Sequence, residues 1–148
     1  MTRRTGRDRI RHEKTVEIHA PLDHVWRVLT DIRRWPEWTA SMRAVHLLQP
    51  GPLDVGSRVR LKQPRIPAAT WRITRYEPSV RFDWETQLPG VGLRAAHVLT
   101  ETGNGRVLLG LSVELAGPLV RVLGRQMDTT ARRNLELESA GLKAAGEA

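Results

Sequence analysis

The sequence predicts an α+β domain in which a curved antiparallel sheet of about six to seven strands wraps around one long C-terminal helix. Three observations lead to this fold class. A chain of 148 residues suits one domain with a core of its own. Between residues 43 and 115, short runs that alternate apolar and polar residues are separated by tight turns, which is typical of antiparallel strands. After residue 117 the apolar residues recur with helical spacing instead.

The C-terminal helix is predicted from Pro118, which suits the first turn of a helix, to Ala145. At about 1.5 Å per residue it would be about 42 Å long and would cross the whole domain. Polar residues interrupt its apolar stripe, so we expect a helix that packs at its ends and lines a cavity with its middle. The alternative is a core helix with a frayed polar flank. The stripe consists of Leu119, Val122, Leu123, Met127, Ala131, Leu135 and Leu142, and the polar interruptions are Gln126, Thr130 and Asn134.

The first strand is expected at residues 13–20, before Pro21. Apolar residues at 25–29 then predict a short helix, and Thr30 or Asp31 can cap a second one. The Trp-Pro-Glu-Trp segment at 35–38 should break that helix, because proline restricts the residue before it. We interpret its two tryptophans as a plug at one end of the core. A role in stacking against a ligand is the less favoured alternative.

Further strands are predicted wherever period-two alternation lies between turn residues. Pro64 to Pro67 falls between two of these strands and is expected to be irregular, because proline cannot donate to a strand ladder. The inward face of the strand at 80–88 should carry aromatic residues. The predicted strands are 43–49, 58–63, 69–77, 80–88, 92–101 and 106–115.

The formal net charge is +8, and half of the excess falls within residues 1–14. Residues 1–12 are therefore predicted to be a disordered basic tail, followed by a single domain at 13–148. The tail lacks aromatic residues and adjoins no nucleic-acid-binding motif, so no nucleic-acid partner is expected.

The composition sets the expected compartment. No apolar run approaches the length of a transmembrane helix, and no apolar segment near the N-terminus indicates a signal peptide. The chain contains no cysteine. We therefore expect a cytoplasmic protein, monomeric or homodimeric. The chain strongly prefers arginine to lysine: its only lysines are Lys14, Lys62 and Lys143. Such a preference is typical of GC-rich bacterial genomes.

Several short segments of the chain carry a family resemblance: Val16-Glu17-Ile18-His19-Ala20-Pro21, Val25-Trp26, Leu29-Thr30-Asp31, Trp35-Pro36-Glu37-Trp38, Gly56, Val59, Phe82-Asp83-Trp84, Pro89-Gly90, Gly105-Arg106-Val107 and Gly117-Pro118-Leu119. In order and spacing, these segments resemble the START-like, helix-grip superfamily (SRPBCC), and within it the polyketide cyclase/dehydrase-like branch. The resemblance spans roughly residues 13–145. It implies a domain that binds a hydrophobic small molecule, such as a lipid or polyketide, between sheet and helix. Because the superfamily shares no universal catalytic residues, it implies no particular reaction.

Catalytic and metal-binding motifs are absent from the sequence: it has no HExxH, no GxSxG and no phosphate-binding glycine loop, so no metal and no cofactor are expected. His97 is the one catalytic candidate, because strand alternation turns it toward the cavity. A lone inward histidine is more often a hydrogen-bonded core residue, and the alternative is a general acid or base. Arg75 falls on the same side of its strand as Trp71 and could therefore reach the cavity mouth. Extension of its side chain into solvent at the strand end is the favoured alternative.

Three functions remain open: a binder or carrier of a hydrophobic small molecule, a polyketide cyclase or dehydratase that uses His97 with Arg75 or Thr130, and a module that binds a partner protein. The first is favoured, because the inward faces are apolar and no catalytic set is recognisable. The expected ligand-binding residues are Trp71, Ile73, Arg75, Phe82, Trp84, His97, Leu99, Leu109, Leu111, Gln126, Met127 and Thr130.

Overall fold

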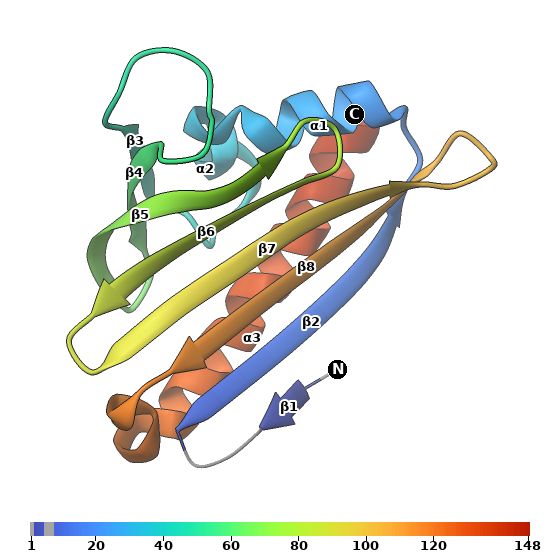
Figure 1. The fold of residues 1–148 in the computed structure, drawn as a ribbon. Coiled ribbons are helices and arrows are strands. Elements are labelled where there is room, and N and C mark those ends of the chain that lie inside the picture. Colours follow the sequence, from blue (N-terminus) through green and yellow to red (C-terminus); the bar gives the residue numbers. More distant parts are fainter. Residues whose placement is uncertain (1, 5–7) are drawn as a thin grey trace.

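The computed structural model describes residues 2–4 and 8–148. In this part of the chain, eight antiparallel strands form one sheet in the order β1-β2-β8-β7-β6-β5-β4-β3. The sheet curves around the long helix α3, which crosses behind it in Figure 1. The predicted helix-grip architecture is therefore confirmed. The strands are β1 (Thr2–Arg4), β2 (Arg9–Ile18), β3 (Ala44–Leu47), β4 (Arg58–Gln63), β5 (Ile66–Glu77), β6 (Arg81–Leu88), β7 (Val91–Glu101) and β8 (Val107–Ala116).

The predicted boundary between a disordered tail and the domain lies too far along the chain. Residues 9–12 already belong to β2, which pairs with β8 along its whole length. Ile10 is 1% exposed and His12 is 2% exposed, so this stretch alternates buried and solvent-facing residues as a strand should. The many charged residues in this stretch hide that alternation in the sequence. Residues 2–4 form β1, which pairs with β2, so the prediction of disorder is wrong there too. For residues 1 and 5–7 the prediction concerns positions that the structure does not describe.

The long helix α3 (Pro118–Glu147) runs further than predicted and is kinked. Leu123 has the non-helical dihedral angles φ −113° and ψ 22°, directly before Gly124, and glycine is a common companion of helix kinks. The kink turns the first segment, so that Val122, predicted to be buried, is 76% exposed while Val120 is fully buried.

Two pairs of polar side chains connect α3 to β2. The Nε2 atom of His12 lies 2.7 Å from Asp128 Oδ1, and Lys14 Nζ lies 3.2 Å from Glu136 Oε1.

The start of α3 is fixed by a close approach between two turns. Gly117 has φ 142°, and a Cβ atom there would lie only 2.4 Å from the carbonyl oxygen of Gly90. Only glycine fits this position. The backbone N–H of Leu119 donates to that same carbonyl at 2.9 Å, which holds the first turn of α3 against the β6–β7 hairpin.

The short helices follow β2 and close one end of the space between sheet and α3. They are α1 (Leu22–Thr30), the 3₁₀ helix η1 (Ile32–Arg34) and α2 (Trp35–Trp38). The Trp-Pro-Glu-Trp segment thus forms a helical turn rather than a break, with Pro36 in its first turn, where its missing N–H is tolerated. None of the helices in the described residues is both long and apolar enough to cross a membrane.

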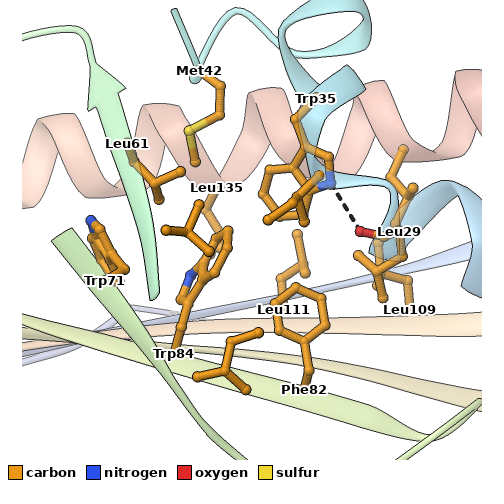
Figure 2. Packing of buried hydrophobic residues seen from close by; sticks show 14 of the residues in the cluster. Leu29, Trp35, Met42, Leu61, Trp71, Phe82, Trp84, Leu109, Leu111 and Leu135 are labelled. Atoms are coloured by element: carbon orange, nitrogen blue, oxygen red, sulfur yellow. Dashed lines mark hydrogen bonds between the residues drawn. The ribbon is translucent and has the colours of Figure 1, made fainter. Parts of the chain in front are cut away.

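Trp35 is the centre of the buried aromatic cluster, as the interpretation of a core plug predicts. It is 1% exposed, and its indole N–H donates to the carbonyl oxygen of Leu29 at 2.9 Å (Figure 2). Its ring lies 5.2 Å from that of Trp84 and 5.5 Å from that of His97, measured between centroids. The end of the core beneath the short helices is therefore filled by protein.

Strand β5 begins three residues earlier than predicted and ends where predicted, at Glu77. It begins at Ile66, so Pro67 lies within it, beside a register irregularity between Leu61 and Gln63 on β4. A bulge at this place accommodates a residue that cannot donate to the ladder. A second irregularity, between Ile73 and Arg75, affects the candidate site.

Candidate functional site

A cavity of about 400 Å³ lies between the concave face of the sheet and α3. Its walls are mostly apolar. It opens between the β4–β5 hairpin, the β6–β7 hairpin and the kinked start of α3, where the lining residues Arg65, Pro67, Pro89 and Leu123 are exposed. The apolar lining comprises Met42, Leu61, Ile66, Pro67, Trp71, Trp84, Leu88, Pro89, Val91, Leu93, Ala95, Ala96, Leu111, Val113, Leu115, Leu119, Leu123, Met127, Ala131 and Leu135.

Seven of the twelve residues expected to bind a ligand line this cavity. They come from β5, β6, β7, β8 and α3, so the fold brings together residues far apart in sequence. The seven are Trp71, Trp84, His97, Leu111, Gln126, Met127 and Thr130. That they contact a ligand stays a prediction.

Four of the remaining expected residues are buried but do not line the cavity. Ile73, Phe82, Leu99 and Leu109 are at most 4% exposed and belong to the packed core. Phe82 lies with its ring centroid 6.4 Å from that of Trp35, and Figure 2 shows it and Leu109 on the Trp35 side of the cluster. The alternation of residues along each strand correctly placed these four side chains on the inner face of the sheet. It could not show at which end of that face the short helices fill the space.

Arg75 faces away from the cavity, as the favoured alternative has it, and does not line it. The register irregularity between Ile73 and Arg75 shifts the alternation, so that Arg75 is exposed although Trp71 and Ile73 are buried. The Nε atom of Arg75 donates to Glu77 Oε2 at 2.8 Å. Arg75 therefore contributes neither charge nor hydrogen bonds to the cavity.

His97 projects from β7 and forms part of the cavity wall. It is 2% exposed and stacks on Phe82, with ring centroids 4.2 Å apart. Burial lowers the pKa of His97 from 6.5 to about 4, although the hydrogen bond to the Phe82 carbonyl opposes this shift. The imidazole is therefore neutral near pH 7.

The hydrogen bond of His97 also determines its tautomer. The Nδ1 atom lies 3.1 Å from the carbonyl oxygen of Phe82, and a carbonyl only accepts, so Nδ1 carries the proton. The Nε2 atom is then left with a lone pair. Every enclosed polar side-chain atom of the described residues has a hydrogen bond. Nε2 forms none among them, so it retains surface facing the cavity and can accept a hydrogen bond or a proton there.

Glu138 is a cavity residue that the sequence reasoning missed. It lies on α3, four residues after Asn134, three after Leu135 and seven after Ala131, all of which also line the cavity. This helical spacing was the available signal. Glu138 keeps some accessible surface, but packed protein surrounds it, and this burial raises the pKa of its carboxyl from 4.5 to about 7. A hydrogen bond from Ser41 partly opposes that shift.

Other polar groups also face this otherwise apolar space. Asn134 is 9% exposed and Gln63 is 8% exposed, and both line the cavity. Their side-chain amides form no hydrogen bond with other described residues. Polar groups that are largely buried and unpaired are costly, and at such positions they commonly pair with a ligand or water. No cluster of three or more potential metal ligands occurs among the described residues.

Comparison with solved structures shows a shared fold. The Zhui aromatase/cyclase from Streptomyces sp. R1128 is 21% identical, with a TM-score of 0.76, over 94% of this chain and 94% of that one. A START superfamily protein from Mycobacterium smegmatis is 19% identical, with a TM-score of 0.73, over 93% and 97%. Norcoclaurine synthase from Thalictrum flavum, in complex with dopamine and hydroxybenzaldehyde, is 13% identical, with a TM-score of 0.69, over 93% and 86%.

No curated protein matches the chain. A family model does: residues 9–147 match the one described as polyketide cyclase / dehydrase and lipid transport. The match starts with β2 and ends with α3, so it includes every element that lines the cavity. The chain therefore belongs to the polyketide cyclase/dehydrase and lipid transport family.

Proposed function

We propose that the protein binds and carries a hydrophobic small molecule, such as a lipid or a polyketide, in the cavity between the sheet and α3. The observation that carries this proposal is the cavity of about 400 Å³ with an apolar lining and an open mouth. Its size falls within the range of roughly 300–1,000 Å³ that ligand pockets occupy. The family to which the chain belongs includes lipid transport in its description.

The aromatic lining of the cavity supports an elongated or flat apolar ligand. Trp71 and Trp84 line one wall, with ring centroids 5.9 Å apart, and aromatic rings offer large apolar contact surfaces. Trp35 contacts Trp84 and His97 from behind but does not line the cavity. A ligand would therefore enter between the hairpins and α3 and stop at His97 and Trp84.

Filling the cavity tests this proposal. Ala131 lines the cavity on α3, whereas Ala140 lies on the same helix, is exposed and does not line it. Ala131→Phe should weaken the binding of decan-1-ol at least tenfold, and Ala140→Phe should leave it unchanged. Quenching of tryptophan fluorescence reports binding, because Trp71 and Trp84 are in the wall. Equal affinity in wild type and Ala131→Phe would show that the ligand binds elsewhere.

A second candidate is a cyclase or dehydratase, and one observation favours it. The cavity holds a neutral imidazole with a free lone pair, on His97, and a carboxyl whose pKa of about 7 lets it donate a proton near neutral pH, on Glu138. A neutral imidazole can accept a proton and a protonated carboxyl can donate one, although an imidazole with a pKa of about 4 is a weak base near neutral pH. One of the structures that share the fold is described as an aromatase/cyclase.

His97→Phe separates the two candidates. Phenylalanine fills similar space but has no ring nitrogen. A carrier should keep its fold and lose at most roughly 1–2 kcal/mol of affinity, the scale of one hydrogen bond. A cyclase should keep binding but lose turnover of a linear polyketide by roughly 10²–10⁴-fold. Unchanged turnover in this variant would exclude His97 as the base.

A further inference from the structure

We propose that the ligand places a hydrogen-bond-donating end, an amine or a hydroxyl group, against Glu138, and that Glu138 discriminates against ligands that end in a carboxylate. The inference rests on the proposed function, since it concerns the ligand of the same cavity. It is carried by the hydrogen-bond directions around Glu138 and by the polar groups that share its cavity.

When the Glu138 carboxyl is ionised, the chain of hydrogen bonds behind it has only one consistent direction. The backbone N–H of Ser41 donates to Thr39 Oγ1 at 3.2 Å, and the Ser41 hydroxyl donates to Glu138 Oε1 at 3.2 Å. The two hydroxyl oxygens lie 2.8 Å apart. Because the single hydroxyl proton of Ser41 goes to Glu138, the Thr39 hydroxyl must donate to Ser41 Oγ.

This chain is buried and holds the carboxyl in place. Ser41 is fully buried and Thr39 is 4% exposed. Both hydroxyls are used in the chain, which supplies one donor to Oε1 and none to Oε2. Among the described residues Glu138 has no ion-pair partner. A carboxyl that accepts one hydrogen bond in an apolar cavity still has acceptor capacity, and a donor on the ligand would satisfy it.

Two further features of the lining favour the same kind of ligand end, whereas the amides of Gln63 and Asn134 can donate as well as accept and favour neither kind. His97 presents the Nε2 lone pair, a second acceptor, because its proton is on Nδ1 facing the Phe82 carbonyl. Arg65 is the only lysine or arginine among the described lining residues, and it is exposed in the β4–β5 turn at the mouth. No cation inside the cavity would therefore compensate a ligand carboxylate beside Glu138, and two like charges repel strongly away from water.

The test uses three ligands with the same ten-carbon chain: decylamine, decan-1-ol and decanoate. Isothermal titration calorimetry at pH 8 measures their affinities for wild type, Glu138→Gln and Glu136→Gln. At this pH most of the Glu138 carboxyl is ionised, given its pKa of about 7. Glu136 is exposed on the same helix, so its variant controls for the loss of one negative charge from a basic protein.

Wild type should bind decylamine and decan-1-ol at least tenfold more tightly than decanoate, and Glu136→Gln should keep this preference. Glu138→Gln should reduce the preference to threefold or less, mainly because decanoate binds better. Equal binding of the three ligands by wild type, a preference for decanoate, or an unchanged preference in Glu138→Gln would overturn the inference while leaving the proposed function in place. Failure of all three ligands to bind wild type would overturn the proposed function itself. The wild-type comparison needs no variant, so it decides even if Glu138→Gln fails to fold.

Discussion

Replacing Glu138 by Gln should change how the free energy of unfolding depends on pH. Burial raises the pKa of Glu138 from 4.5 to about 7 in the folded protein, so between these pH values the folded protein holds a proton that the unfolded chain has released. The stability from this group is fully present below pH 4.5 and is lost as the pH rises through 7. Each pH unit in this window costs about 1.4 kcal/mol.

His97 acts in the opposite direction. Burial lowers its pKa from 6.5 to about 4, so in that window the unfolded chain binds a proton that the folded protein does not. The stability that depends on neutral His97 is present above pH 6.5 and is lost as the pH falls toward 4, again by about 1.4 kcal/mol per unit. In wild type the two effects largely cancel between pH 4.5 and 6.5, and removing one residue exposes the other.

The expected differences follow from these slopes. Between pH 5 and pH 6.5, Glu138→Gln should gain roughly 2 kcal/mol of stability relative to wild type, and His97→Phe should lose roughly 2 kcal/mol relative to wild type. Urea denaturation of the variants and wild type at each pH measures this, because subtraction removes the contributions of all other groups. Glu136→Gln controls for the loss of a carboxyl. Differences that do not change with pH, or that change with the same sign in both variants, would refute the assigned burial of the two groups.

Three substitutions test the packing by urea denaturation. Trp35→Ala should lower the free energy of unfolding by roughly 3–5 kcal/mol, because the side chain is 1% exposed at the centre of the aromatic cluster; a loss below about 1 kcal/mol would contradict this. Ile10→Ala should cost roughly 2–5 kcal/mol, whereas a disordered residue 10 would cost nothing. Gly141→Ala should cost roughly 1–3 kcal/mol, because the new Cβ would lie 2.2 Å from the carbonyl oxygen of Trp38. Gly103→Ala is the control, because a Cβ there meets nothing within 4 Å; it should change stability by less than about 0.5 kcal/mol. An equal loss of stability in Gly141→Ala and Gly103→Ala would show that the clash with Trp38 is relieved.

The fold could be predicted because its signals are local and repeated. Alternation in β6 identified Phe82 and Trp84 as inward residues, and both are at most 2% exposed. Short turns between such strands leave little choice but an antiparallel sheet. The beginning of β2 was missed because arginines dominate its composition, although Ile10 and His12 have the same period of two.

The site was less predictable because it depends on deviations from regular periods. The irregularity between Ile73 and Arg75 reverses the facing of Arg75, and nothing local in the sequence marks it. The kink at Leu123 likewise exposes Val122 and opens the mouth. These features arise from tertiary packing, which overrides a regular alternation.

Glu138 illustrates a different limit. Its helical spacing was readable, but a charged residue on an apolar stripe is normally assigned to solvent. Its burial depends on Ser41, which lies 97 positions earlier in the chain and donates to its carboxyl. A contact of that range cannot be derived from the periodicity of one helix. The position of Asn134 beside it on the stripe was predicted, and its lining of the cavity agrees.

The most direct test of ligand carriage is a native mass spectrum of freshly purified protein, compared with its spectrum under denaturing conditions. We expect a mass above that of the 16.7 kDa chain, with the excess released on denaturation as an apolar small molecule. Ala131→Phe should lose this excess mass, and Ala140→Phe should retain it. An excess mass that Ala131→Phe retains in full, or a wild-type spectrum of bare protein that stays unchanged after incubation with decan-1-ol, would contradict a ligand-carrying cavity.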